Sequence, residues 1–306
     1  MSIINKINLM KFSFLHTVAV LIVLASNQAW GEVLVIQSLP IKPYEEAFQG
    51  FRSVCGEKII RVTGPDLSEA EISAKARRER PNLILAIGMD ALAKLKAIKD
   101  TPIVYVMVLN PQTLTNNGEN ITGVSMNLAP EKQFGVLREI LPQIRKIGII
   151  FDQGKTGPYV GRVYNAAQLF GIELLTRQVR SSREALTALE AMAGKVDAIW
   201  LIPDTTVVNP TTVDFLLLSS IEKKLPVITF SEKYAEKGAL LSLEVDAFQS
   251  GKQAGEIAGK ILAGKNVSGI KGEDSRGSVM TVNLVVAKKL GISINDNIIK
   301  RARVIR

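Results

Sequence analysis

Short apolar runs alternate with longer stretches of helical periodicity along the first part of the chain. The runs are rich in β-branched residues and predict buried strands at Glu32–Ser38, Lys58–Thr63, Leu83–Ile87 and Ile103–Val108. Between them, apolar residues at helical spacing predict helices at 43–55, 68–80 and 90–99. Near-continuous apolar strands separated by helices indicate a parallel sheet that is covered on both faces.

The same alternation starts again further along the chain. Strands are predicted at Lys146–Phe151, Ile172–Arg177, Asp197–Ile202, Pro226–Phe230 and Ala239–Glu244, and helices at 130–141, 157–170, 182–193, 209–224 and 247–263. Asn209-Pro210 is a typical helix start, with an N-cap residue followed by proline at the first helical position. Two such runs predict an α/β protein of two doubly wound, Rossmann-like lobes.

The boundary between the lobes is expected in the polar stretch Asn116–Pro130, where we interpret the extended piece Ile121–Ser125 as a crossover. We assign residues 32–124 plus about 246–280 to lobe 1 and residues 125–245 to lobe 2, so that several crossovers form a hinge. The last segment, 281–306, is expected to return across the hinge, and the pattern leaves its lobe open.

The first 31 residues have the features of a secretory signal peptide. Two lysines precede an apolar stretch from Phe12 to Ala25, and Ala29-Trp30-Gly31 places small residues at the −3 and −1 positions. We expect cleavage before Glu32 and export to the periplasm as a soluble protein. An uncleaved membrane anchor is the alternative, which the short apolar stretch disfavours. No cysteine lies just after the apolar run, where a lipid would be attached, so lipidation is not expected.

The composition narrows the chemistry that is available. The 306 residues are 47% hydrophobic and 22% charged, as is typical of globular proteins. A single cysteine, Cys55, and a single histidine, His16, exclude an internal disulfide, a zinc site of the common ligand sets and a histidine-based catalytic triad. We therefore expect no metal, no cofactor and no enzymatic activity.

The positive charge is spread thinly. The formal net charge is +9, with short basic clusters at 77–80 and 300–303. Neither cluster is interleaved with aromatic residues or attached to a nucleic-acid-binding motif. Solvated surface is the expected role of both clusters, and no nucleic-acid partner is predicted.

Candidate ligand contacts follow from the predicted sheets, because open parallel sheets bind ligands beyond the carboxyl ends of their strands. The candidates at such ends are Ser38, Met89, Asp90, Thr156, Gly157, Asp204, Thr205 and Ser231. Asp90 and Ser231 have the alternative role of helix N-caps. Asp204 precedes a helix that Asn209 already caps, so we expect it either to face the ligand or to brace its own turn.

The glycine-containing stretch Asp152–Gly157 invites comparison with a phosphate-binding loop. A phosphate-binding loop has four residues between its first glycine and Gly-Lys-Thr, whereas five separate Gly148 from Gly154 here and Gly148 lies inside the predicted strand, so no nucleotide site is expected. The N–H groups of Thr156, Gly157 and Tyr159 are expected to form either a carboxylate cradle or a plain tight turn. Tyr44 and Tyr159 are cleft candidates because each is predicted in the first turn of a helix, whereas core packing is expected of Trp200 and Phe230.

The chain also resembles the periplasmic substrate-binding proteins of ABC transporters, in the family that includes tryptophan/tyrosine/phenylalanine-type receptors. The resemblance rests on ITGVS (121–125), LREILPQIRKIGIIFDQG (137–154), AGKVDAIWLIPDTTV (193–207), KLPVITFSE (224–232), GKQAGEIAGKILAGK (251–265) and VNLVVAKKLGISI (282–294). It implies a type I, two-lobed fold that closes over a small ligand by hinge bending. It also implies ligand contacts at Ser125 and at the strand-end candidates above other than Ser231.

Two stretches depart from the pattern of this family. The loop Pro203-Asp204-Thr205-Thr206 lacks the threonine that precedes the aspartate in relatives. Relatives tend to have an aromatic-rich Gly-Phe-Asp-Tyr-like stretch where this chain has residues 243–248 (LEVDAF). These departures bear on the identity of the ligand rather than on the fold.

The function expected is that of a monomeric periplasmic solute-binding protein that delivers an amino acid or a related small molecule to an inner-membrane ABC permease. Asp204 would pair with an ammonium group, and Tyr44, Tyr159 or Phe248 would flank the side chain of the ligand. A sensory receptor that presents the closed form to a histidine kinase or chemoreceptor is the alternative. An exported α/β enzyme is disfavoured, because the exported chain has no histidine and no Gly-x-Ser-x-Gly elbow.

Overall fold

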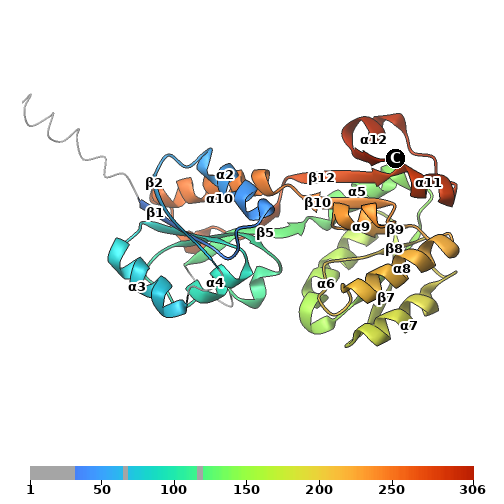
Figure 1. Cartoon of the computed structure of the whole chain (residues 1–306), viewed down its shortest axis with the longest axis horizontal. Coiled ribbons are helices and arrows are strands. Elements are labelled where there is room, and N and C mark those ends of the chain that lie inside the picture. The colour runs from blue at the N-terminus through green and yellow to red at the C-terminus, as the bar shows by residue number, and fades with distance from the viewer. Residues whose placement is uncertain (1–31, 65–67, 116–119) are drawn as a thin grey trace, which may run out of the picture.

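The computed structural model describes residues 32–64, 68–115 and 120–306. The predicted signal peptide therefore lies outside the described residues. The described chain forms two α/β lobes side by side, joined by extended segments (Figure 1). The prediction of two doubly wound lobes is thus confirmed.

Lobe 1 is built on a parallel sheet with the strand order β11-β5-β4-β3-β1-β2. Helices cover both of its faces because its central strands are apolar throughout, and β3 is buried at every position. Its elements are β1 (Glu32–Gln37), α2 (Lys42–Arg52), β2 (Lys58–Thr63), α3 (Glu69–Glu79), β3 (Leu83–Ile87), α4 (Met89–Leu95), β4 (Ile103–Val108), η1 (Pro111–Thr113), β5 (Ile121–Leu128), α10 (Ala247–Leu262), η2 (Val267–Gly269) and β11 (Glu273–Ser275).

Helices α2 and α10 pack very closely on one face of this sheet, although about 200 residues separate them in sequence. Glycines allow the close approach. A Cβ on Gly251 would lie 1.9 Å from the carbonyl oxygen of Ala47, and one on Gly50 would lie 1.9 Å from the carbonyl oxygen of Phe248. The returning helix α10 is thereby fixed to lobe 1.

Lobe 2 has the strand order β13-β12-β10-β9-β8-β6-β7, parallel except where β10 and β12 pair antiparallel. Trp200 and Phe134 are at the centre of its core. Its elements are α5 (Pro130–Ile140), β6 (Lys146–Phe151), α6 (Gln153–Leu169), β7 (Glu173–Gln178), α7 (Ser182–Met192), β8 (Ala198–Trp200), α8 (Pro210–Glu222), β9 (Val227–Thr229), α9 (Glu232–Glu236), β10 (Leu241–Val245), β12 (Ser278–Asn283), α11 (Leu284–Leu290), α12 (Asp296–Arg301) and β13 (Arg303–Ile305).

The chain passes between the lobes three times: through β5, from β10 to α10, and from β11 to β12. Because β12 and β13 pair inside the second sheet, the segment 281–306 belongs to lobe 2. An ion pair between Arg162 of α6 and Asp274 of β11 also joins the lobes. Across the described residues, no helix is both long and apolar enough to cross a bilayer.

Helix α6 begins earlier than the sequence pattern predicted. The predicted range was 157–170, but the helix starts at Gln153, because the Asp152 side chain caps it by accepting the Gly154 N–H at 2.9 Å. Pro158 therefore lies inside the helix rather than in its first turn. Tyr159, expected in the first turn, likewise lies beyond it, and its side chain is buried in lobe 2.

Candidate ligand site between the lobes

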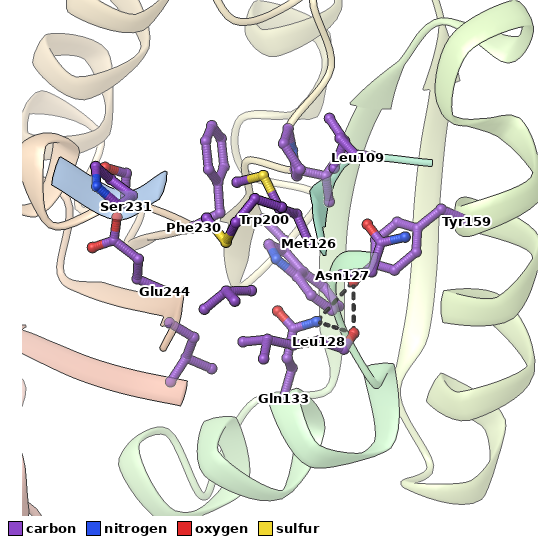
Figure 2. Close-up of a pocket in the computed structure, with 16 residues that line it drawn as sticks. Leu109, Met126, Asn127, Leu128, Gln133, Tyr159, Trp200, Phe230, Ser231 and Glu244 are labelled. Atoms are coloured by element: carbon purple, nitrogen blue, oxygen red, sulfur yellow. Dashed lines mark hydrogen bonds between the residues drawn. The ribbon is translucent and has the colours of Figure 1, made fainter. Parts of the chain in front are cut away.

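A cavity of about 340 Å³ lies between the lobes, where β5 and β10 connect them. Its lining is mostly apolar, and three aromatic side chains, Tyr159, Trp200 and Phe230, contribute to it (Figure 2). Lobe 1 supplies Pro43, Met107 and Leu109, strand β5 supplies Met126, Asn127 and Leu128, and lobe 2 supplies Gln133, Tyr159, Trp200, Ile202, Pro203, Phe230, Ser231, Leu243, Glu244 and Val245. A cavity of this size and polarity suits one small organic molecule.

Met107 reaches the cavity through an irregularity in strand β4. The pairing of β4 with β5 shifts between Val106 and Val108, and Met107 has a φ of 58°. A positive φ is uncommon for a residue other than glycine, and bulges of this kind re-aim side chains beside functional sites. The bulge turns a residue of a buried strand towards the ligand cavity.

Trp200 forms part of the wall on the lobe 2 side. It ends strand β8 and is only 2% exposed. Its indole packs edge-to-face on Phe134, with ring centroids 5.2 Å apart. The ring is therefore held rigidly, and a ligand in the cavity would contact a fixed surface.

Gln133 and Tyr159 form the main hydrogen-bonded group of the lining. The Gln133 amide nitrogen donates to the Leu128 carbonyl at 3.0 Å and to the Tyr159 hydroxyl at 2.7 Å (Figure 2). Burial raises the pKa of Tyr159, so its hydroxyl stays protonated and is a neutral polar group. These bonds fix both side chains before any ligand arrives.

Glu244 is the only charged side chain that lines the cavity within the described part of the chain. It is half-buried on β10, and its Oε2 accepts a long hydrogen bond of 3.4 Å from the Glu232 N–H. Burial raises the pKa of Glu244, and the nearby carboxylate of Glu232 adds to the effect. The described lining of the cavity thus has one acidic side chain and no basic side chain.

Two of the predicted contacts line this cavity, Tyr159 and Ser231. Ser231 also occupies the N-cap position of α9, but its side chain makes no capping hydrogen bond. The other predicted contacts lie outside the cavity lining.

Three candidates of lobe 1 lie around the start of α4. Ser38 Oγ donates to the Ile87 carbonyl at 3.1 Å and accepts the Ala91 N–H at 2.9 Å, so it braces this turn. Met89 is half-buried and Asp90 is exposed in the first helical turn. The alternative N-cap role of Asp90 is not found, because Gly88 is the N-cap.

Two aromatic candidates also lie outside the cavity lining. The Tyr44 ring lies close to Gly88, where an added Cβ would come within 2.6 Å of it. Burial raises the pKa of Tyr44, and the Asp90 carboxylate contributes. Phe248 is 38% exposed on α10.

Asp204 is placed in its alternative role, as the brace of its own loop. It is 1% exposed and accepts four hydrogen bonds, from Asp152 N (2.8 Å), Thr156 Oγ1 (2.5 Å), Thr206 N (2.9 Å) and Val207 N (3.3 Å). Both carboxylate oxygens are thus occupied within lobe 2. Thr205, beside it, is exposed and outside the cavity lining.

The amides of Thr156 and Gly157 form neither of the two expected structures, a carboxylate cradle or a plain tight turn, because they lie inside helix α6. The Thr156 N–H donates to the Asp152 carbonyl at 2.9 Å, and Gly157 is likewise inside α6. Ser125 also has protein partners, since its hydroxyl donates to Asp274 at 3.0 Å and accepts the Asn127 N–H at 3.1 Å.

Sequence reasoning missed Met107, Gln133 and Glu244 as lining residues. Trp200 and Phe230 do pack in the core, as expected, but they also form its cavity surface. One signal was available for Glu244, because it lies in the stretch 243–248 that departs from the family pattern. The bulge at Met107 has no signature in the sequence.

Known proteins with similar sequences and structures agree with this architecture. A tyrosine-binding protein of Clostridioides difficile (strain R20291) is 27% identical over 208 residues, which are 65% of this chain and 60% of that protein. A ligand-free, open substrate-binding protein with adhesive properties from Clostridium difficile has a TM-score of 0.72 at 22% identity, over 90% of this chain and 99% of that one. An ABC domain in complex with L-Trp from Streptococcus pneumonia has a TM-score of 0.62 at 20% identity, with the same two coverages.

The sequence model of one family covers most of this chain. It is described as "ABC transporter substrate binding protein", and it matches residues 64–305, which include every described element from α3 to β13 and every residue of the cavity lining except Pro43. The chain therefore belongs to the ABC transporter substrate-binding protein family.

Proposed function

We propose that this protein is a non-catalytic solute-binding protein that captures one small molecule between its lobes for uptake by an ABC permease. The observation that carries the proposal is the cavity of about 340 Å³ at the crossovers, lined from both lobes. Its size suits an amino acid or a related compound. Its aromatic and thioether walls suit a ligand with an apolar or aromatic body.

The relatives support this class of ligand. One of them is described as tyrosine-binding, and a structural neighbour is a complex with L-Trp. The ligand would lie against Trp200 and Phe230, with Tyr159 and Ser231 as neutral polar contacts. On closure, the lobe 1 candidates at the start of α4 would approach it from the opposite side.

The place and partners of the protein follow from this role. We expect a monomer outside the cytoplasm, exported by the leader and recognised in its closed form by a permease of the inner membrane. No metal or cofactor takes part. Closure of the two lobes brings their surfaces together around the ligand, and this role requires no chemical step.

A thermal-shift screen over amino acids, amines, small peptides, purines and organic acids tests the proposal. A ligand at 100 times its dissociation constant stabilises the folded state by about 2.7 kcal/mol, which gives a readable shift in Tm. Calorimetric titration then measures the affinity, and small-angle scattering with and without the ligand measures closure.

A matched pair of variants locates the binding. Ser231→Phe fills the cavity from its lining and should abolish the shift. Ser268→Phe makes the same change at an exposed position of lobe 1 and should leave the shift intact. Equal binding by both variants, or conversion of a bound compound into a new product, would contradict the proposal.

A further inference from the structure

The charge of the cavity lining is one-sided. Among the described residues that line it, Glu244 has a carboxylate and there is no lysine, arginine or histidine. The remaining polar side chains, Asn127, Gln133, Tyr159 and Ser231, are neutral. An anionic ligand without a positive charge would therefore be repelled by the one charged side chain of this lining.

The carboxylate of Glu244 has no ion-pair partner among the described residues. Arg303 is the basic side chain that acts on it, but Arg303 bonds to Glu232, with 2.6 Å between Arg303 Nη1 and Glu232 Oε2. The negative charges of Glu232 and, more weakly, of Glu46 on α2 also act on Glu244 and raise its pKa. Glu244 takes part in none of the ion pairs formed by the described residues, and its one hydrogen bond, from the Glu232 N–H, is long.

A half-buried carboxylate without a cationic partner is costly, because burial disfavours the charged form. A cation that enters the cavity would remove that cost and form a charge-assisted hydrogen bond. The aromatic wall acts in the same direction, since the faces of indole and phenyl rings attract cations.

Resting on the proposed function, we infer that Glu244 is the residue that recognises the charge of the ligand, and that the ligand carries a protonated amine on an apolar or aromatic body. The amine bonds to the Glu244 carboxylate at one end of the cavity, and the apolar body lies along Trp200 and Phe230. Amines and amine-bearing amino acids are accepted, and the corresponding acids that lack the amine are rejected.

Calorimetric titration with matched probes tests this assignment on the full exported chain. The phenol series comprises tyramine, tyrosine, N-acetyltyramine and 3-(4-hydroxyphenyl)propionate, which share a ring and differ in charge. The corresponding phenyl and indole series are titrated in parallel. We expect tyramine or tyrosine, or a counterpart in the other series, to bind, and the N-acetyl and deaminated forms to bind at least tenfold more weakly.

Three variants assign the preference to the side chain. Glu244→Gln keeps the shape and removes the charge, so amine affinity should fall by about ten- to a hundredfold while the preference over the N-acetyl form disappears. Glu244→Asp restores the charge at shorter reach and should recover part of the affinity. Glu173→Gln is the control, because it makes the same change at an exposed residue of β7 that lies outside the cavity lining.

The pH dependence of binding gives an independent readout. The ionised form of Glu244 binds the cation, so the affinity for the amine should fall as the pH is lowered and the carboxylate becomes protonated; because burial raises the pKa of Glu244, this fall should begin at a higher pH than for an exposed glutamate. The charged groups that act on this titration are Glu232 and Glu46, which favour the protonated form, and Arg303, which favours the ionised form. In Glu244→Gln this fall should be lost.

The failures are distinguishable. If a deaminated or N-acetylated probe binds and closes the lobes as well as the amine does, or if Glu244→Gln retains full amine affinity with an unchanged Tm, the role of Glu244 is wrong and solute binding stands. If no compound of the screen or of the three series binds, both the role of Glu244 and the proposed function are overturned.

Discussion

Asp204→Ala separates a structural role from a ligand contact more sharply than any other single substitution in this chain. The side chain is 1% exposed and joins three segments: its own loop, the end of β6 at Asp152, and Thr156 in α6. Truncation leaves four donors without their acceptor, two of them on the loop that follows Asp204. We therefore expect the substitution to destabilise lobe 2.

The size of the effect follows from these bonds. A hydrogen bond to a charged group contributes about 1.5–3 kcal/mol, and the donors share one site, so their energies do not add fully. Loss of such a buried network costs roughly 3–5 kcal/mol. At about 2–4 °C per kcal/mol for a lobe of this size, Tm should fall by at least about 6 °C.

Urea or thermal unfolding monitored by circular dichroism measures this loss, and titration of the folded fraction measures affinity. Asp204→Asn should be intermediate, because the amide keeps one acceptor but places an NH2 group opposite existing donors. Asp197→Ala is the control for removing an aspartate that accepts backbone N–H bonds, because Asp197 accepts two such bonds but lies at an exposed site. A Tm within about 1 °C of the parent together with a tenfold or greater loss of affinity would show that Asp204 contacts the ligand after all.

Three further predictions concern the helix pair, the indole and the interlobe ion pair. Gly251→Ala should destabilise lobe 1 by about 1–3 kcal/mol in denaturant unfolding, because the new Cβ would meet the backbone of α2. Gly259→Ala, on the exposed side of the same helix, meets nothing within 4 Å and should be neutral or stabilising. Equal effects of the two substitutions would disprove the steric reason. Ligand binding should change the emission of Trp200, and Trp200→Phe should abolish that change; an unchanged spectrum with a ligand bound by calorimetry would place the ligand elsewhere. Arg162→Ala should lower the free energy of unfolding by less than about 1 kcal/mol, because Arg162 is half-exposed. It should nevertheless alter the small-angle scattering profile of the ligand-free protein, since the ion pair with Asp274 joins the lobes. An identical profile would mean that this ion pair does not restrain the hinge.

The sequence by itself determined the elements and the class of fold. Hydrophobic periodicity reports which residues are buried, so the apolar runs located the central strands of both sheets, and two alternating runs predicted two lobes. The short strands β11 and β13 carry no such run and were not predicted. One helix cap was also predicted correctly, because it depends only on neighbouring residues in the sequence. Asn209 caps α8 by accepting the Thr212 N–H at 3.0 Å, with Pro210 at the first helical position, as predicted.

Tertiary structure decided the site, because its side chains are set by partners far away in sequence. Two of the four donors to Asp204, Asp152 N and Thr156 Oγ1, lie 52 and 48 residues away in sequence, so the sequence around Asp204 did not distinguish a brace from a ligand contact. Glu244 lines the cavity because β10 ends where the chain crosses between the lobes, and the pairing of Arg303 with Glu232, 71 residues apart in sequence, was equally invisible in the sequence. Periodicity shows that a residue is buried, whereas the folded arrangement of the strands determines which group, protein or ligand, it is buried against.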